Sequence, residues 1–356
     1  MARRSRRSST RRSRPGLLSF LPAVPAPRRR RTSASSGALP WVPAPVRRTA
    51  AVRPPARRAT AGRWSRATFV GSAGTRSYDV YLPAGHRTTT QVPLVMLLHG
   101  CNQTSDQFVA ATRFAALADR HGFVIAAPRQ TRAHQPGSCW RWYEAAHQER
   151  GHGEPAILAG IAARMLAETS RWRIDPSRVY AAGISAGGAM ALILAATYPD
   201  VFAAVGVHSA PAYRSASNGG SALGAMHGRG AVPMPLPGAR MAPLVLVQGT
   251  ADPVVHGRSG SLVADQWLAY DRARSTDPRD PQRITRSRAV HKSSADGRRY
   301  TVTGWYSARG RKRLEYWEIQ GLGHAWSGGL RDGSYSDPRG PRASTVMWTF
   351  FAAQRP

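Results

Sequence analysis

VYAAGISAGG, residues 179–188, is the stretch that decides the fold. Its first four residues are apolar and predict a short buried strand, and the alanine-rich run at 186–197 predicts a helix. Between them, Gly183-Ile184-Ser185-Ala186-Gly187 matches the pattern G-x-S-x-G. A strand, a tight turn and a helix in this order form a nucleophile elbow, in which the glycines let strand and helix approach and leave the serine hydroxyl exposed. The alternative is a glycine-rich turn whose serine only caps the helix.

Apolar runs and helical segments alternate on both sides of this stretch. Strands are expected at 67–73, 77–83, 93–99, 122–127, 203–207, 244–247, 299–303 and 314–319, and helices at 105–120, 154–169, 261–272 and 343–353. This alternation predicts an α/β fold with a mostly parallel central sheet flanked by helices. Residues 210–242 form a Gly/Pro-rich insert without periodicity, and inserts of this length usually cover a functional site or are disordered.

Positive charge is concentrated at the N-terminus. The 356 residues carry 51 Lys and Arg against 19 Asp and Glu, a formal charge of +32, which alone would favour a nucleic-acid partner. Residues 1–66 hold 18 arginines and no carboxylate, so the remaining 33 bases leave an excess of only +14. Residues 1–65, rich in Arg, Pro and Ser, are predicted to be a disordered basic tail, and 66–356 a single folded domain. A transmembrane helix is excluded, because no run of 18 uncharged apolar residues exists.

Two features bear on the compartment. LLSFLPAVPA at 17–26 resembles the hydrophobic region of a signal peptide, but prolines interrupt it, so a solvated basic tail and a misplaced start codon are alternatives. The two cysteines, Cys101 and Cys139, are too few for a disulfide framework or a four-ligand zinc site. One bridge between them would indicate an oxidising compartment, whereas two free thiols would fit the cytosol.

A serine nucleophile needs a general base, and the base needs a carboxylate to orient it. In the elbow architecture these residues follow the serine in the order acid, then histidine. QGTADP at 248–253 places Asp252 just beyond an expected strand, at the sheet edge where active-site groups gather. The alternative for Asp252 is a turn aspartate before proline. Asp265 and Asp271 fall inside an expected helix and are interpreted as solvated.

Three histidines follow the acid. His324 lies in GLGHAW, directly after the expected strand at 314–319, and the glycines beside it would let this loop reach over Ser185. His256 is only four residues past Asp252, too close to meet it easily, and His291 lies in a basic stretch that we expect to be irregular. We therefore interpret His324 as the base; the alternative is an ordinary loop histidine.

The anion that forms on the attacked carbonyl oxygen needs two backbone N–H donors. One is expected at Ala186, directly after the serine, and the other at Cys101 in the loop after the strand at 93–99. Cys139 is followed closely by Trp140 and Trp142, which we interpret as lining a substrate pocket; the alternative is that these aromatic residues belong to the core.

These segments together resemble the esterase family of the PHB-depolymerase type, bacterial α/β-hydrolases that also include feruloyl and acetylxylan esterases. The matching segments are RSYDVYLP at 76–83, LLHGCNQTSDQF at 97–108, LADRHGFVIAAPRQ at 117–130, CWRWYEAAHQERGHGEPA at 139–156, the serine elbow at 178–190, QGTADPVV at 248–255 and GLGHAWSGG at 321–329. The resemblance implies an α/β-hydrolase fold, a triad of Ser185, Asp252 and His324, oxyanion donors at Cys101 and Ala186, and a Cys101–Cys139 disulfide. Trp326, in the last of these segments, joins Trp140 and Trp142 as a predicted substrate contact.

The activity implied by the resemblance is hydrolysis of short hydroxyacyl or related esters, without metal or cofactor. The chain ends at Pro356 with no substrate-binding domain after the catalytic one, so we expect soluble esters or oligomers rather than a solid polymer. A feruloyl or acetylxylan esterase is the alternative. A second alternative is a non-catalytic protein that holds a polyanion through its arginine-rich tail. An extracellular or periplasmic location is expected from the family and the implied disulfide, with the cytoplasm as the alternative.

Overall fold

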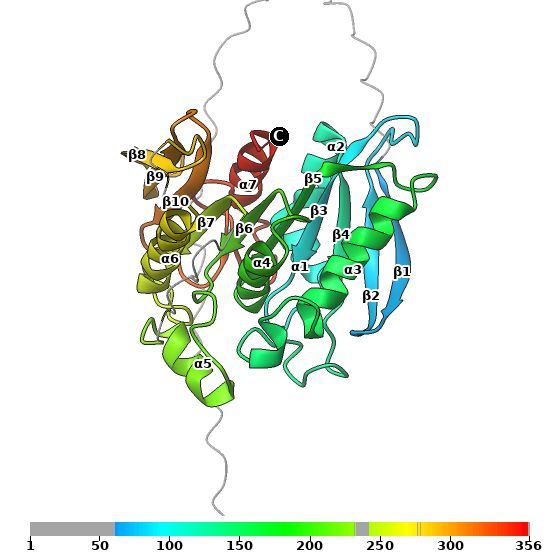
Figure 1. Ribbon diagram of the computed structural model, residues 1–356, viewed down its shortest axis with the longest axis horizontal. Coiled ribbons are helices and arrows are strands. Elements are labelled where there is room, and N and C mark those ends of the chain that lie inside the picture. Colours follow the sequence, from blue (N-terminus) through cyan, green and yellow to red (C-terminus); the bar gives the residue numbers. More distant parts are fainter. Residues whose placement is uncertain (1–60, 231, 233–241, 276, 278, 355–356) are drawn as a thin grey trace, which may run out of the picture. The chain divides into compact units, whose positions relative to one another are not determined.

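A ten-stranded sheet forms the centre of the computed structural model, which describes residues 61–230, 232, 242–275, 277 and 279–354 (Figure 1). The strand order is β1-β2-β4-β3-β5-β6-β7-β10-β9-β8. The strands are β1 (Arg63–Gly71), β2 (Gly74–Leu82), β3 (Val92–Leu98), β4 (Val124–Pro128), β5 (Ile174–Ile184), β6 (Ala204–His208), β7 (Leu244–Gly249), β8 (Ile284–Ser293), β9 (Arg299–Ser307) and β10 (Lys312–Ile319). The six central strands, β4, β3, β5, β6, β7 and β10, pair in parallel. Antiparallel strands extend the sheet at both ends, β2 and β1 beside β4, and β9 and β8 beside β10.

Helices cover both faces of the parallel strands (Figure 1). They are α1 (Ser105–Thr112), α2 (Phe114–His121), α3 (Gly153–Ala167), α4 (Ala186–Thr197), α5 (Gly219–Met226), α6 (Arg258–Arg274) and α7 (Ala343–Ala352). Helices α3, α4 and α6 pack on one face, where Trp267 joins a buried apolar cluster, and α1, α2 and α7 pack on the other, where Phe351 does so. Since both faces are covered, the central strands are continuous apolar runs. This confirms the predicted α/β architecture.

A second, two-stranded sheet follows the large one. It pairs β11 (Trp326–Ser327) in parallel with β12 (Ser336–Asp337). Residues 328–335 connect the two strands as a loop. This loop contacts α1 through the Leu330 N–H and the Ala111 carbonyl, and it contacts the segment after β3 through the Ser334 carbonyl and Gln103. In the described part of the chain, no helix has the length and apolarity needed to span a bilayer.

The structure differs from the sequence-based expectation in four elements. The helix expected at 105–120 is two helices, because Arg113 takes a left-handed conformation (φ 61°) and ends α1. The stretch around His291, expected to be irregular, is strand β8, which pairs with β9 through its backbone. Part of the insert at 210–242 forms α5. Strand β1 begins at Arg63, inside the expected tail. The rest of the tail, 1–60, lies outside the described residues, as do residues 231 and 233–241 of the insert.

Candidate active site

Ser185 occupies the turn between β5 and α4 in a conformation that side chains rarely adopt, with φ 56° and ψ −125°. Gly183 and Gly187, on either side of it, must be glycines because a Cβ atom at either position would overlap neighbouring backbone atoms. A Cβ on Gly183 would lie 2.4 Å from the carbonyl oxygen of Gly187, and a Cβ on Gly187 would lie 2.1 Å from that of Leu98. The Ser185 side chain is partly exposed, whereas its neighbours on both sides are buried. This geometry is that of a nucleophile elbow.

Asp252 and His324 are hydrogen bonded, with 2.8 Å between Asp252 Oδ2 and His324 Nδ1. The other carboxylate oxygen, Oδ1, accepts the backbone N–H groups of Val254 and Val255. Burial would raise the pKa of the Asp252 carboxyl, but the hydrogen bond from His324, its charge and the two backbone N–H groups outweigh burial and lower that pKa. Asp252 is therefore a fixed, ionised acceptor that can orient the imidazole.

The loops that carry these two side chains are joined by backbone hydrogen bonds. Thr250 N–H donates to the Ile319 carbonyl at 3.0 Å, and Ala251 N–H donates to the Leu322 carbonyl at 3.1 Å. Gly249 allows this approach, because a Cβ there would lie 2.2 Å from the Leu322 oxygen. The neighbouring strands β7 and β10 thus end in one connected structure that holds Asp252 against His324.

His208, the last residue of β6, links this pair to the serine turn. Its carbonyl accepts the Ser185 N–H at 2.9 Å, and its Nε2 accepts the Ser327 N–H, three residues beyond His324, at 3.2 Å. Complete burial, with a smaller contribution from His324, lowers the pKa of His208 to about 3, so the ring is neutral. Because Nε2 is an acceptor, Nδ1 carries the proton and donates it to Ser209 Oγ at 3.0 Å. His208 was not among the residues expected at the site; its position at the carboxyl end of a buried strand is the signal that could have identified it.

The alternative acids and bases lie elsewhere. His256 and His291 are exposed, as is Asp265. Asp271 was expected to be solvated, which is wrong: it is 8% exposed, and its carboxylate accepts the Ile284 N–H at 2.8 Å. Its place on the inner side of α6, against the start of β8, explains the burial.

Cys101 lies in the loop that follows β3 and is bonded to Cys139 in a disulfide. Asn102, with φ 59°, donates its N–H to the Gly137 carbonyl at 2.8 Å, so the two bridged segments are also held by their backbones. Gln103 accepts the Gly100 N–H through Oε1 and donates through Nε2 to the Ser334 carbonyl. In the described part of the chain, no acceptor contacts the Cys101 N–H. The first N–H groups of α4, beginning with Ala186, lack intrahelical partners, as in any helix.

A buried polar network around Gln130 holds the segment that carries Cys139. Gln130 donates to the Cys139 carbonyl at 2.8 Å and to Glu154 Oε1 at 2.6 Å, and it accepts a hydrogen bond from Arg76. Its N–H donates to His99 Nε2, at the start of the Cys101 loop. Burial lowers the pKa of His99 to about 4, so this ring is neutral and its Nδ1–H donates to the Gly100 carbonyl at 2.8 Å. These contacts position the Cys101 loop. They join residues distant in the chain and could not be predicted from the sequence pattern.

The three tryptophans predicted to contact substrate are all buried. Trp140 is fully buried and donates to the His99 carbonyl at 3.0 Å. Trp326 is 1% exposed, donates to Ser344 Oγ and stacks on His208. Trp142 is 6% exposed within the apolar cluster that α3 and α4 share. This burial favours the core alternative, in which Trp140 contacts the His99 backbone and Trp326 packs on His208.

Tyr335 is the aromatic residue that does lie exposed beside the pair. Its ring is edge-on to the His324 imidazole, with centroids 6.1 Å apart, and the residue is 46% exposed with φ 48°. A strained backbone at a bulky side chain is a mark of functional sites. Among the described residues, no group of His, Cys, Asp and Glu is arranged to hold a metal ion.

The order and pairing of strands, the serine turn and the Asp252–His324 pair define an α/β-hydrolase fold. An acetyl xylan esterase from Aspergillus awamori has a similar structure, with a TM-score of 0.59 and 18% identity, covering 74% of this chain and 94% of that one. The family model for esterase PHB depolymerase matches residues 76–273, more than half of the chain. The chain therefore belongs to the esterase PHB depolymerase family.

Curated relatives match shorter segments. Poly(3-hydroxyalkanoate) depolymerase C of Paucimonas lemoignei is 37% identical over 146 residues, which cover 41% of this chain and 34% of that protein. Feruloyl esterase B of Neurospora crassa is 32% identical over 142 residues, which cover 40% of this chain and 46% of that protein. The chain thus matches between a third and a half of the length of these relatives.

Proposed function

We propose that this protein is a serine carboxylesterase that hydrolyses short-chain hydroxyacyl esters, such as oligomers of 3-hydroxybutyrate. The observation that carries the proposal is the 2.8 Å hydrogen bond between Asp252 and His324, on loops at the sheet edge where Ser185 occupies its strained turn. Membership of the esterase PHB depolymerase family and the names of the matched relatives support the substrate class.

In the proposed reaction, Ser185 Oγ attacks the ester carbonyl while His324 Nε2 accepts its proton. Asp252 holds His324 with Nδ1 protonated and stabilises the imidazolium that results. His324 then donates the proton to the leaving alcohol, and an acyl-enzyme remains on Ser185. In the second half, water attacks the acyl-enzyme carbonyl while His324 accepts its proton. His324 then returns the proton to Ser185 Oγ, and the carboxylic acid is released. The Ala186 and Cys101 N–H groups would stabilise the oxyanion in both halves.

The test is turnover of p-nitrophenyl butyrate by the full chain and its variants. Ser185→Ala and His324→Ala should each lower kcat by on the order of 10³-fold or more, since triad members act as a unit. The matched controls Ser287→Ala and His256→Ala change exposed residues and should keep wild-type turnover. Loss of turnover in His256→Ala but not in His324→Ala would show that the base is misassigned. Lack of turnover by the unmodified chain on any short ester would favour the non-catalytic, polyanion-binding alternative.

A second candidate is an esterase of plant-polysaccharide esters, of the feruloyl or acetylxylan type. A polar pocket of about 310 Å³ favours it. Asn102, which directly follows Cys101 in the chain, lines this pocket together with Arg132 and Ser138. Among the described residues, the side chains of these three make no hydrogen bond or ion pair, so they are available to the hydroxyl groups of a sugar.

The two candidates differ in which substrate depends on this pocket. Replacing Arg132, which lines the same pocket, with Gln should raise KM for an acetylated xylo-oligosaccharide and leave p-nitrophenyl 3-hydroxybutyrate unaffected if the second candidate is right. A higher kcat/KM for the hydroxybutyrate ester, with no effect of Arg132→Gln on either substrate, would favour the first.

The disulfide also supports a proposed location. A Cys101–Cys139 bridge is stable in an oxidising compartment, so we place the enzyme outside the cytoplasm, in the periplasm or the medium. Thiol titration of the exported protein under denaturing, non-reducing conditions should find no free thiol.

A further inference from the structure

Most of the net positive charge outside the N-terminal segment lies in one hairpin. Residues 283–313, which form β8, β9 and the start of β10, contain ten Lys and Arg residues against one carboxylate, Asp296. Their net charge of +9 compares with +14 for the whole chain after residue 66. The hairpin is at the end of the sheet opposite β1, and β8 is the edge strand (Figure 1).

The Lys and Arg side chains of β8 are exposed. Arg286, Arg288 and Lys292 are all exposed, and within the described residues none of them forms an ion pair. At the opposite edge of the sheet, by contrast, Arg66 of β1 is paired with Asp79 at 2.8 Å. A charge that the protein itself leaves uncompensated is available to an external anion.

Strand register brings these bases onto the same face as aromatic side chains. Arg286 pairs with Tyr306 and Lys292 pairs with Tyr300, and directly paired residues share a face of the sheet. The Arg286 guanidinium lies 5.3 Å from the centroid of the Tyr306 ring. Tyr300 stacks on Trp317 of β10 with centroids 5.3 Å apart, and both are partly exposed. Cations alternating with aromatic rings can bind a polymer by charge and by stacking together.

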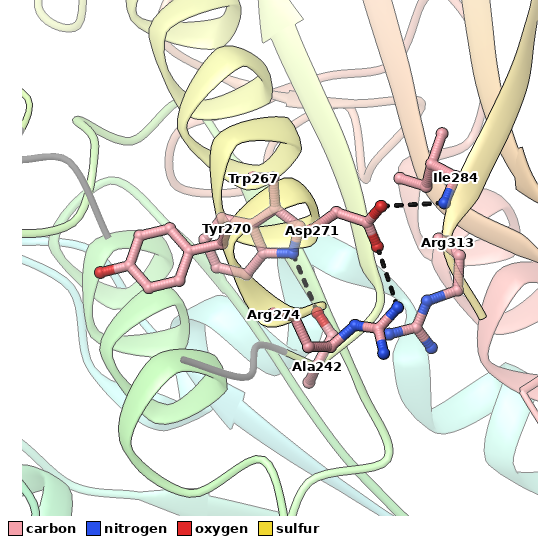
Figure 2. A pocket seen from close by; sticks show the side chains of 7 residues that line it. All are labelled: Ala242, Trp267, Tyr270, Asp271, Arg274, Ile284 and Arg313. Carbon is pink, nitrogen blue, oxygen red and sulfur yellow. Dashed lines mark hydrogen bonds and ion pairs between the residues drawn. The ribbon is translucent and has the colours of Figure 1, made fainter. Parts of the chain in front are cut away.

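The hairpin is held rigidly where β8 begins. Asp271 of α6 accepts the Ile284 N–H at 2.8 Å and forms an ion pair with Arg274 at 3.8 Å (Figure 2). Arg274 also pairs with Asp280. The cavity between these residues is only about 20 Å³, room for about one water molecule and too small for a ligand. The hydrogen bond and ion pairs of Asp271 and Arg274 therefore anchor the strand. A surface fixed in this way loses little conformational entropy on binding.

The other end of the hairpin leads to the candidate active site. Asp296 accepts the Gly340 N–H at 2.7 Å, and Arg298 pairs with Asp337 of β12 at 3.0 Å. An open hollow of about 510 Å³ lies here, lined by Asp296, Gly297, Arg298, Arg299, Gln320, Gly321 and Arg339. Gly321 begins the loop that carries His324. A polymer bound along β8 and β9 would therefore continue toward the site.

We propose that the exposed face of the β8–β9 hairpin binds an acidic polysaccharide. The bases supply charge complementarity for carboxylate groups, and the aromatic rings supply the flat apolar surfaces on which sugars stack. The disulfide at Cys101 favours a polysaccharide over a nucleic acid, since it is suited to compartments outside the cytoplasm. Charged side chains also protect a sheet edge from pairing with other chains, but that role requires no preference for any polymer. The inference goes beyond the proposed esterase activity, and the binding does not depend on catalysis.

The test uses the full chain and immobilised polygalacturonate in low salt. The triple variant Arg286→Gln, Arg288→Gln, Lys292→Gln should weaken binding by about tenfold or more and reduce its salt dependence. The matched control Arg87→Gln, Arg120→Gln, Arg229→Gln removes the same charge from exposed residues elsewhere and should weaken binding by about twofold or less. Both variants keep the arginines of residues 1–66, so that contribution cancels. Ser185→Ala should bind as the unmodified chain does, whether or not the proposed esterase activity exists.

Three results would overturn the inference. Equal weakening by the two triple variants would mean that only total charge matters. Binding of single-stranded oligo(dT) that is tighter than that of polygalacturonate, and equally sensitive to the hairpin variant, would identify nucleic acid as the ligand. Unchanged binding in the hairpin variant, with thermal unfolding also unchanged, would assign the exposed bases to edge protection alone.

Discussion

A Cβ atom on Gly187 would stand 2.1 Å from the carbonyl oxygen of Leu98 and 2.5 Å from that of His99. Both contacts are with backbone atoms, which cannot rotate away. The serine turn, the start of α4 and the end of β3 are thus packed as closely as their backbones allow. This packing brings Ser185 beside the loop that carries Cys101.

Gly187→Ala should therefore cost the protein its fold or several kcal/mol of stability, because β3 and α4 must separate. Urea denaturation measures the loss. Gly224→Ala is the matched control: it lies within α5, a Cβ there meets nothing within 4 Å, and alanine favours the helix. Wild-type stability in Gly187→Ala would contradict the close approach of strand and helix.

Asp252→Asn should lower kcat on p-nitrophenyl butyrate by about 10³-fold or more while the fold is kept, since the amide can bond His324 but cannot stabilise the imidazolium. Asp265→Asn, an exposed change on α6, is the control and should leave kcat unchanged. An Asp252→Asn enzyme with near-normal kcat would remove Asp252 from the triad.

The Cys101–Cys139 bridge closes a loop with a sequence separation of 38 residues. Chain entropy gives such a loop roughly 3–4 kcal/mol of stabilisation, so Cys101→Ser with Cys139→Ser should lower the free energy of unfolding by about that amount. We also expect a lower kcat, because the loop with the Cys101 N–H loses one of its two attachments to residues 137–139. Unchanged stability in the double variant would show that the polar network around Gln130 suffices.

The elements found from the sequence are those whose signal is local. The apolar run of β5, the glycines of the elbow and the apolar start of α4 adjoin in the chain, so their pattern shows both the elements and the turn. The pairing of Asp252 with His324 followed from chain order and from the rule that strand ends meet at one edge. Their roles in catalysis stay predictions.

The features that escaped the sequence depend on neighbours distant in the chain. Strand β8 is almost wholly exposed, so it has no apolar alternation and is held by backbone pairing with β9. His208 matters because β6 lies next to β5, and Asp271 is buried because β8 returns to α6. The burial of Trp140 likewise depends on the course of the chain around His99, so an aromatic cluster in the sequence could not distinguish pocket from core.

Acid should destabilise the protein through its buried histidines. His208 has an ordinary pKa of about 6.5 when unfolded and about 3 when folded, so between these values the unfolded state binds more protons. Its stabilising contribution is complete above pH 6.5 and is lost as pH falls toward 3, by up to about 1.4 kcal/mol per pH unit. Between pH 6.5 and 4, His208→Gln should reduce the slope of the unfolding free energy against pH. The reduction corresponds to about one fewer proton taken up on unfolding. His256→Gln, which changes an exposed ring, should not; equal slopes in all three proteins would contradict the burial of His208.

Two N-terminal truncations should separate the basic tail from the domain. Gly62 N–H donates to the Tyr81 hydroxyl, Trp64 packs on the Tyr81 ring with centroids 4.8 Å apart, and Arg66 pairs with Asp79. Removal of residues 1–60 keeps all three contacts and takes away 16 arginines. It should leave kcat on a soluble ester within about twofold, because catalysis depends on a site built from later segments. It should also weaken the salt-sensitive part of heparin binding.

Removal of residues 1–66 deletes the first part of β1 and leaves Asp79 of β2 without its Arg66 partner. This variant should have a lower melting temperature than the shorter truncation, by several degrees, although it lacks only six more residues. Differential scanning calorimetry of the two proteins makes the comparison. Equal melting temperatures would move the domain boundary beyond residue 66, and loss of ester turnover on removal of 1–60 would mean that the tail packs on the domain.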